Sequence, residues 1–122
     1  MRYQTVLTDR TRELATLVVA AHWRSAFERE AHEAVGRRCG VTDEEMAALW
    51  SGLLPSLADP GEHLAVHTTA ALVRSGTLTD EQYAAAVDGI GERGLFELTT
   101  LVGYYATLAL QLRVFAGESA AQ

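Results

Sequence analysis

The sequence predicts an all-α domain of about six helices, and three observations carry that prediction. Apolar residues recur at the spacing of one helix face, as at Leu14, Leu17, Val18 and Ala21. Helix-start patterns, in which Ser, Thr or Asp precedes Glu or Gln by three residues, recur along the chain. No segment alternates apolar and polar residues as a half-buried strand does.

The first three helices follow from these start signals. Thr8 precedes the first apolar pattern and is expected to cap a helix that begins at Asp9. Ser25-Ala-Phe-Glu28 has the form of a capping box and opens a second helix, which Gly40 ends. Thr42-Asp-Glu-Glu45 is another such box and opens a short third helix.

The remaining helices follow a loop at 52–61, which contains both prolines. Asp59 is expected to cap a fourth helix, with proline at its first position, and this helix ends near Gly76. Thr79 opens a fifth helix, and a glycine-rich stretch separates that helix from a sixth at 95–116. We see no domain boundary, so residues 1–122 are expected to form one domain.

The last segment, 95–116, is apolar on nearly every side. Its length invites a membrane-spanning interpretation, but Glu97, Gln111 and Arg113 argue against one because charges are costly in a bilayer. A helix of this kind is normally buried inside a protein or in a subunit interface. The sequence therefore predicts a homo-oligomer that does not bind a membrane.

Composition excludes several classes of function. Ten arginines against sixteen acidic residues give a net charge of −6, which disfavours binding to nucleic acid. There is no lysine, so no lysine Schiff base can form. Cys39 is the only cysteine, which excludes an intrachain disulfide and a Cys-x-x-Cys pair. The N-terminal residues lack a signal-peptide pattern, so we expect a cytoplasmic protein.

The second predicted helix carries the candidate chemistry. If Phe27 marks the centre of its apolar face, Glu28 and His32 lie on the shoulder of that face, one turn apart. A carboxylate and an imidazole at the edge of a core form a plausible acid/base pair. A structural interpretation stands beside it, since Ser25 and Glu28 can simply cap the helix and His32 can be a satisfied histidine at the core edge.

Glu13 followed after eleven residues by Ser25-Ala-Phe-Glu28-Arg-Glu-Ala-His32 resembles the core of the carboxymuconolactone decarboxylase family, which includes the AhpD-like alkylhydroperoxidases. The flanking LTDRTRELATLVVAAHW and the C-terminal GERGLFELTTLVGYYATLALQLRVF are similar to family members too, so the resemblance spans about residues 7–115. It implies an AhpD-like helical bundle that assembles as trimers or hexamers.

The peroxidase branch of that family uses a glutamate and then Cys-x-x-Cys-x-x-x-His in a proton relay. By this resemblance Glu13 matches the relay glutamate and His32 the relay histidine, while Ser25 and Glu28 stand in place of the two cysteines. A hydroxyl and a carboxylate cannot form the disulfide or sulfenic acid that peroxide reduction needs. Cys39 lies more than one turn beyond His32 and has no resolving cysteine, so peroxidase activity is disfavoured.

The resemblance then implies a cofactor-free, metal-free acid/base enzyme: a decarboxylase, isomerase or lyase for a small carboxylated or enolisable substrate. Decarboxylation of an unsaturated lactone acid requires a dienolate to be stabilised and then protonated. Glu28 is suited to act as base, His32 to carry the proton and Glu13 to orient the imidazole. The alternative is a non-catalytic member that binds a small molecule or serves as a scaffold.

Further residues are candidates for substrate binding, although plain packing or solvent exposure also accounts for them: His22, Trp23, Arg24, Ser25, Tyr104 and Tyr105. Arg24 would pair with a substrate carboxylate. We predict no metal site. Two possible metal sites are less favoured alternatives. One would use the pair His63 and His67 with Glu62 or a group from a neighbouring subunit, and the other would use Glu28, His32 and His22.

Overall fold

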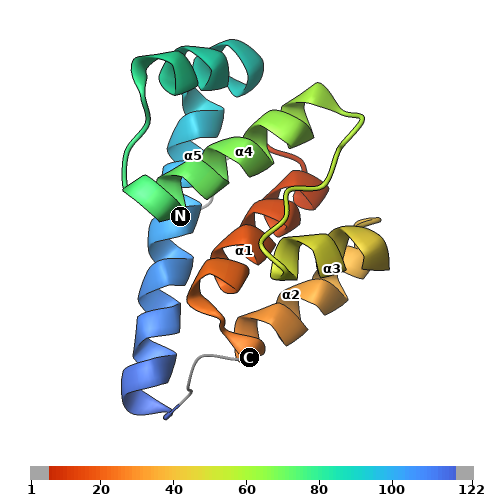
Figure 1. Ribbon diagram of the computed structural model, residues 1–122, viewed down its shortest axis with the longest axis vertical. Coiled ribbons are helices and arrows are strands. Elements are labelled where there is room, and N and C mark those ends of the chain that lie inside the picture. The colour runs from red at the N-terminus through yellow and green to blue at the C-terminus, as the bar shows by residue number, and fades with distance from the viewer. Residues whose placement is uncertain (1–5, 118–122) are drawn as a thin grey trace.

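The computed structural model describes residues 6–117, and within that range it contains helices and no strand. There are five helices, namely α1 (Asp9–Trp23), α2 (Ala26–Arg38), α3 (Asp43–Trp50), α4 (Pro60–Ser75) and α5 (Asp80–Phe115) (Figure 1). The predicted all-α class is therefore confirmed.

The helix starts lie where the sequence predicts them. The residues that cap the five helices are Thr8, Ser25, Thr42, Asp59 and Thr79. Each accepts a hydrogen bond from a backbone N–H in the first turn, because those donors have no partner within the helix. The full two-way capping box forms at Thr42 and at Thr79.

The number of helices differs from the predicted six because the fifth and sixth run on as one bent helix, α5. The bend lies at Gly91, whose φ of 76° and ψ of 167° are not helical. Only glycine adopts this region of backbone space readily. Figure 1 shows the consequence, since the first part of α5 lies across the long blue part that follows.

α1 is the central helix and contacts all four of the others. Its residues Leu14, Ala15, Val19 and Ala20 are completely buried. The side of α1 that carries Leu14 and Val18 packs with α3 and α4, where Leu49 and Val66 are buried. Ala15 packs with Leu98 of α5 in a second cluster. α1 therefore separates two regions of core.

The second part of α5 is only partly buried within the chain, although full burial was one of the two outcomes predicted for it. Several of its large apolar side chains are exposed, namely Phe96, Leu110, Val114 and Phe115. The other predicted outcome, a subunit interface, stays a prediction. No helix within residues 6–117 has the length and apolar character needed to cross a membrane.

Candidate functional site

A carboxylate and an imidazole meet where α1 and α2 lie side by side. Oε1 of Glu13 lies 2.7 Å from Nδ1 of His32, and both side chains are largely buried. The turn at Arg24, which has a left-handed φ of 52°, reverses the chain and sets α2 against α1. This turn places His32 of α2 opposite Glu13 of α1, although 19 residues separate them in the sequence.

Two tyrosines of α5 complete the cluster. The ring of Tyr105 packs edge-on against His32, with 4.9 Å between ring centroids, and Tyr104 packs edge-on against Tyr105 at the same distance. Burial raises the pKa of the Tyr105 phenol, and the nearby charge of Glu13, then Tyr104 and Glu28, raises this pKa further. The phenol is thus held in its protonated form, in which it can donate a hydrogen bond.

Glu28 is more deeply buried than the sequence predicts. Its helical spacing predicts a place on the shoulder of an apolar face centred on Phe27, but Glu28 is 1% exposed and Phe27 is 58% exposed. α2 is rotated so that Glu28 and His32 face inward while Phe27 and Ala31 face outward. The N–H of Glu28 donates to Oγ of Ser25 (3.3 Å), so the capping interpretation of Ser25 is confirmed.

A hollow of about 420 Å³ opens beside this cluster, between α1 and α5. Its wall contains two of the predicted site residues on α5, Tyr104 and Tyr105, together with Glu13 of α1. His32 and Glu28 do not belong to the wall. Among the residues that meet here, Glu13 and Tyr105 therefore have direct access to a molecule in the hollow, and His32 lies behind them.

Five residues of this wall are not among those that the sequence predicted for the site: Arg12, Thr16, Glu97, Thr100 and Leu101. Their signal is helical spacing, because Thr16 is one turn from Arg12 and Thr100 is one turn before Tyr104. The pattern becomes visible only when α1 and α5 are known to face each other.

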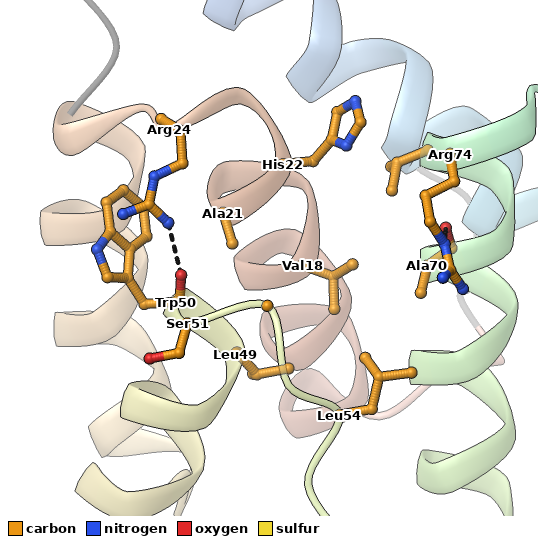
Figure 2. Close-up of a pocket in the computed structure, with 12 residues that line it drawn as sticks. Val18, Ala21, His22, Arg24, Leu49, Trp50, Ser51, Leu54, Ala70 and Arg74 are labelled. Atoms are coloured by element: carbon orange, nitrogen blue, oxygen red, sulfur yellow. Dashed lines mark hydrogen bonds between the residues drawn. The ribbon is translucent and has the colours of Figure 1, made fainter. Parts of the chain in front are cut away.

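Other predicted substrate-binding residues lie on the opposite side of α1. His22 and Arg24 line a second hollow of about 330 Å³ (Figure 2). Nη1 of Arg24 donates to the backbone oxygen of Trp50 (2.5 Å), and its guanidinium lies 3.7 Å from the centroid of the Trp50 ring. Trp23 packs edge-on against His22, and its backbone oxygen accepts a hydrogen bond from Arg113. The predicted binding residues are thus divided between the two hollows, except that Trp23 and Ser25 line neither.

A comparison with known families bears on the half of the chain that holds Glu13, Glu28 and His32. The family model for the carboxymuconolactone decarboxylase family matches residues 1–62. This chain belongs to the carboxymuconolactone decarboxylase family. Searches of curated proteins and of solved structures found no match.

The geometry of this family member gives little support for the two alternative metal sites. The rings of His63 and His67 lie 4.2 Å apart, as predicted for residues one turn apart. Within the described part of the chain, however, no three His, Cys, Asp or Glu side chains gather as metal ligands would. His67 has a lowered pKa, first because of burial and then because of the charges of His63 and Arg74, and this shift favours its neutral ring.

Proposed function

We propose that this member of the carboxymuconolactone decarboxylase family is a cofactor-free acid/base enzyme for a small carboxylated or enolisable substrate. Decarboxylation, isomerisation and related lyase chemistry all lie within this proposal. One observation carries it: the Glu13–His32 pair, 2.7 Å apart, adjoins a hollow of about 420 Å³ that Tyr105 also lines. A hollow of this size is within the range of small-molecule sites.

In this proposal Glu13 and His32 exchange the roles that the sequence suggested for them. Glu13 faces the hollow, so its carboxylate takes a proton from the substrate or returns one to it. His32 lies behind Glu13, shares that proton through Nδ1 and orients the Glu13 carboxylate. Glu28, buried below the cluster, acts as a positioning residue through its charge.

Tyr105 is the proposed donor to the charge that develops on the substrate. In a decarboxylation, the bond to the carboxyl carbon breaks, CO₂ leaves, and the electron pair moves into the lactone carbonyl as a dienolate. The phenol of Tyr105, whose pKa is raised, donates a hydrogen bond to that dienolate oxygen without losing its proton. The Glu13–His32 pair, which has taken up one proton from the substrate carboxyl group or from water, then delivers that proton to carbon and returns to its starting state.

Arg12 is the proposed binding group for a substrate carboxylate, since it lines the same hollow. The thiol chemistry of peroxidase relatives is not part of the proposal, because Ser25 and Glu28 occupy the positions of their cysteines.

The proposal includes a homo-oligomer built from single-domain chains. Its support is the exposed apolar side of α5, where Phe96 is 70% exposed and Val114 is 70% exposed. These two residues and Leu110 fall on one face of the helix at 100° per residue. The family resemblance favours a trimer or a hexamer.

The proposed activity is tested by following proton exchange and loss of the carboxyl group in a set of candidate substrates. Carboxymuconolactone and simple enolisable carboxylic acids are incubated with the protein in D₂O, and NMR follows deuterium uptake and loss of the carboxyl group. We expect turnover that falls roughly 10²–10⁴-fold in Glu13→Gln and His32→Ala, and less in Tyr105→Phe. Glu30→Gln, on the exposed side of α2, is the matched control and keeps full activity.

The pH–rate profile distinguishes a loss of catalysis from a loss of folding stability. If the Glu13–His32 pair is catalytic, Glu13→Gln changes the shape of the profile and Glu30→Gln does not. Full turnover in both Glu13→Gln and His32→Ala would overturn the assignment. Ligand-induced thermal stabilisation without turnover of any compound would instead identify a non-catalytic small-molecule-binding member.

A further inference from the structure

The second hollow, on the opposite side of α1 from Glu13, has the composition of a binding site. Its volume is about 330 Å³, and it lies among α1, α3 and α4 and the segment after α3. Half of its lining residues are aliphatic, namely Val18, Ala21, Leu49, Leu54, Ala70 and Val73. An aliphatic surface of this kind favours the apolar body of a ligand.

The charges at this hollow all have one sign. Arg24 and Arg74 line it together with His22, and no aspartate or glutamate does. This is unusual in a chain whose net charge is −6. In Figure 2 the two arginines stand at opposite sides of the hollow, with Val18, Leu49 and Leu54 between them. The positive charge therefore lies at the edges and the apolar surface lies in the middle.

Both guanidinium groups are held in place before any ligand arrives. Nη1 of Arg24 donates to the backbone oxygen of Trp50, and the guanidinium stacks on the Trp50 ring at 3.7 Å. Nε of Arg74 donates to the backbone oxygen of Ala70 (3.2 Å). Pre-ordered side chains lose less conformational freedom on binding, so they favour affinity.

The backbone at Arg24 adds to this argument. Its φ of 52° is left-handed, which costs a non-glycine residue on the order of 1 kcal/mol. Glycine would end α1 without that cost. An arginine at this position keeps a side chain that reaches the hollow, and functional sites are where such strain is commonly retained.

We propose that this hollow is a second ligand site, distinct from the Glu13–His32 site, that binds a small organic carboxylate with an apolar body. The apolar body lies on the aliphatic lining, the carboxylate pairs with Arg74, and Arg24 adds positive charge at the opposite edge. The positive charge of the two arginines disfavours cationic amines, and the aliphatic lining disfavours inorganic phosphate and other fully polar anions.

Trp50 provides a direct test, because it forms part of the lining and its fluorescence reports occupancy. The probes are phenylacetate and hexanoate, with phenylacetamide as the uncharged analogue and phenethylamine as the cationic one. We expect both carboxylates to bind at least tenfold more tightly than the amide and the amine not to bind. Trp23→Phe removes the other tryptophan, so the fluorescence change of this variant comes from Trp50 alone. Isothermal titration calorimetry measures the same affinities independently.

Variants locate the binding. Arg74→Gln should weaken phenylacetate binding at least tenfold, Arg24→Gln should weaken it less, and Leu54→Trp should block it by filling the hollow. Arg38→Gln, exposed at the end of α2, removes the same charge elsewhere and should leave the affinity unchanged. Because Arg24 also stacks on Trp50, Arg74→Gln is the decisive variant if Arg24→Gln does not fold.

Glu13→Gln separates this inference from the proposed enzyme, since it should abolish turnover and leave phenylacetate binding intact. Equal affinity for carboxylate and amide, unchanged binding in Arg74→Gln, or no binding of either carboxylate at millimolar concentration would each overturn the second site. None of these results would bear on the activity assigned to Glu13.

Discussion

Oε1 of Glu13 and Nδ1 of His32 lie 2.7 Å apart, and this contact joins α1 to α2. Both side chains are shielded, with 14% of Glu13 and 16% of His32 exposed. A hydrogen bond to a charged group in such a place is stronger than one on the surface. The pair therefore has a structural role that can be measured separately from any catalytic one.

We expect a double-mutant cycle of Glu13→Gln and His32→Asn to give a coupling free energy of about 1–2 kcal/mol. Urea unfolding at pH 7 measures it. The control is the pair Arg29 and Glu33, which lies one turn apart on α2 with Arg29 39% exposed and should couple by at most about 0.5 kcal/mol. Equal coupling in the two pairs would show that the 2.7 Å contact is not formed in solution.

The pKa of Tyr105 offers a second check on the same cluster. Burial raises this pKa most, followed by the negative charge of Glu13. Glu13→Gln should therefore lower the pKa of Tyr105 while leaving it above the ordinary value of 10.0. The change is measured by ultraviolet titration of tyrosinate. Subtracting the titration curve of Tyr105→Phe removes the signal of the other tyrosines. A pKa that does not respond would place Glu13 outside electrostatic reach of the phenol.

The helix starts were predictable because each is set by short-range hydrogen bonds. Thr42 and Thr79 bind backbone and side-chain groups only three residues away, so the sequence window contains the whole cause. The bend at Gly91 was anticipated as a break between helices. The sequence did not predict that the helix continues through this bend, because the neighbouring residues do not determine whether a glycine opens a loop or bends a helix.

The inward face of α2 could not be predicted from its own residues. The apolar pattern favoured burial of Phe27, but contact with α1 and α5 turns Glu28 and His32 inward instead. The pairing of Glu13 with His32 was suggested by family resemblance rather than by spacing. Residues such as Glu97, which reach the hollow from α5, depend on the packing of segments far apart in the chain.

The contact of Arg10 with Glu45 makes stability depend on pH. Two hydrogen bonds join them (3.1 and 2.6 Å), and Arg10 also binds Glu62 (3.0 Å). The bond to Arg10 holds the pKa of Glu45 below its ordinary value of 4.5. A carboxyl with a lowered pKa in the folded state stabilises that state above its unfolded pKa, and this effect is lost as the pH falls through the folded pKa.

Glu45→Gln should thus lower the free energy of unfolding by about 1–2 kcal/mol at pH 7. The difference from wild type should shrink below about pH 4.5, where the unfolded carboxyl takes up its proton. Thermal unfolding from pH 3 to pH 8 measures it, and Glu44→Gln, an exposed neighbour on α3, is the control. A difference that stays constant with pH would contradict the charge-based account.

Two glycines of α5 should respond to alanine in opposite directions. Gly91 has a φ of 76°, so Gly91→Ala strains the bend and should destabilise the protein by about 1–2 kcal/mol. Gly103 is helical and exposed, and a Cβ there meets nothing within 4 Å. Gly103→Ala should stabilise by about 0.5–1 kcal/mol. Urea unfolding of both variants tests this, and stabilisation by Gly91→Ala would mean that the bend is not required.

The exposed face of α5 leads to the last prediction, which concerns assembly. Val114 and Phe115 are 70% and 85% exposed near the end of the helix, and Phe96 lies on the same face as Val114. Val114→Glu should shift a trimer or hexamer to monomer in size-exclusion chromatography with light scattering, because it places a charge in the apolar contact. Ala47→Glu adds the same charge on exposed α3 and should leave the assembly unchanged. A wild-type monomer at every concentration would refute the interface.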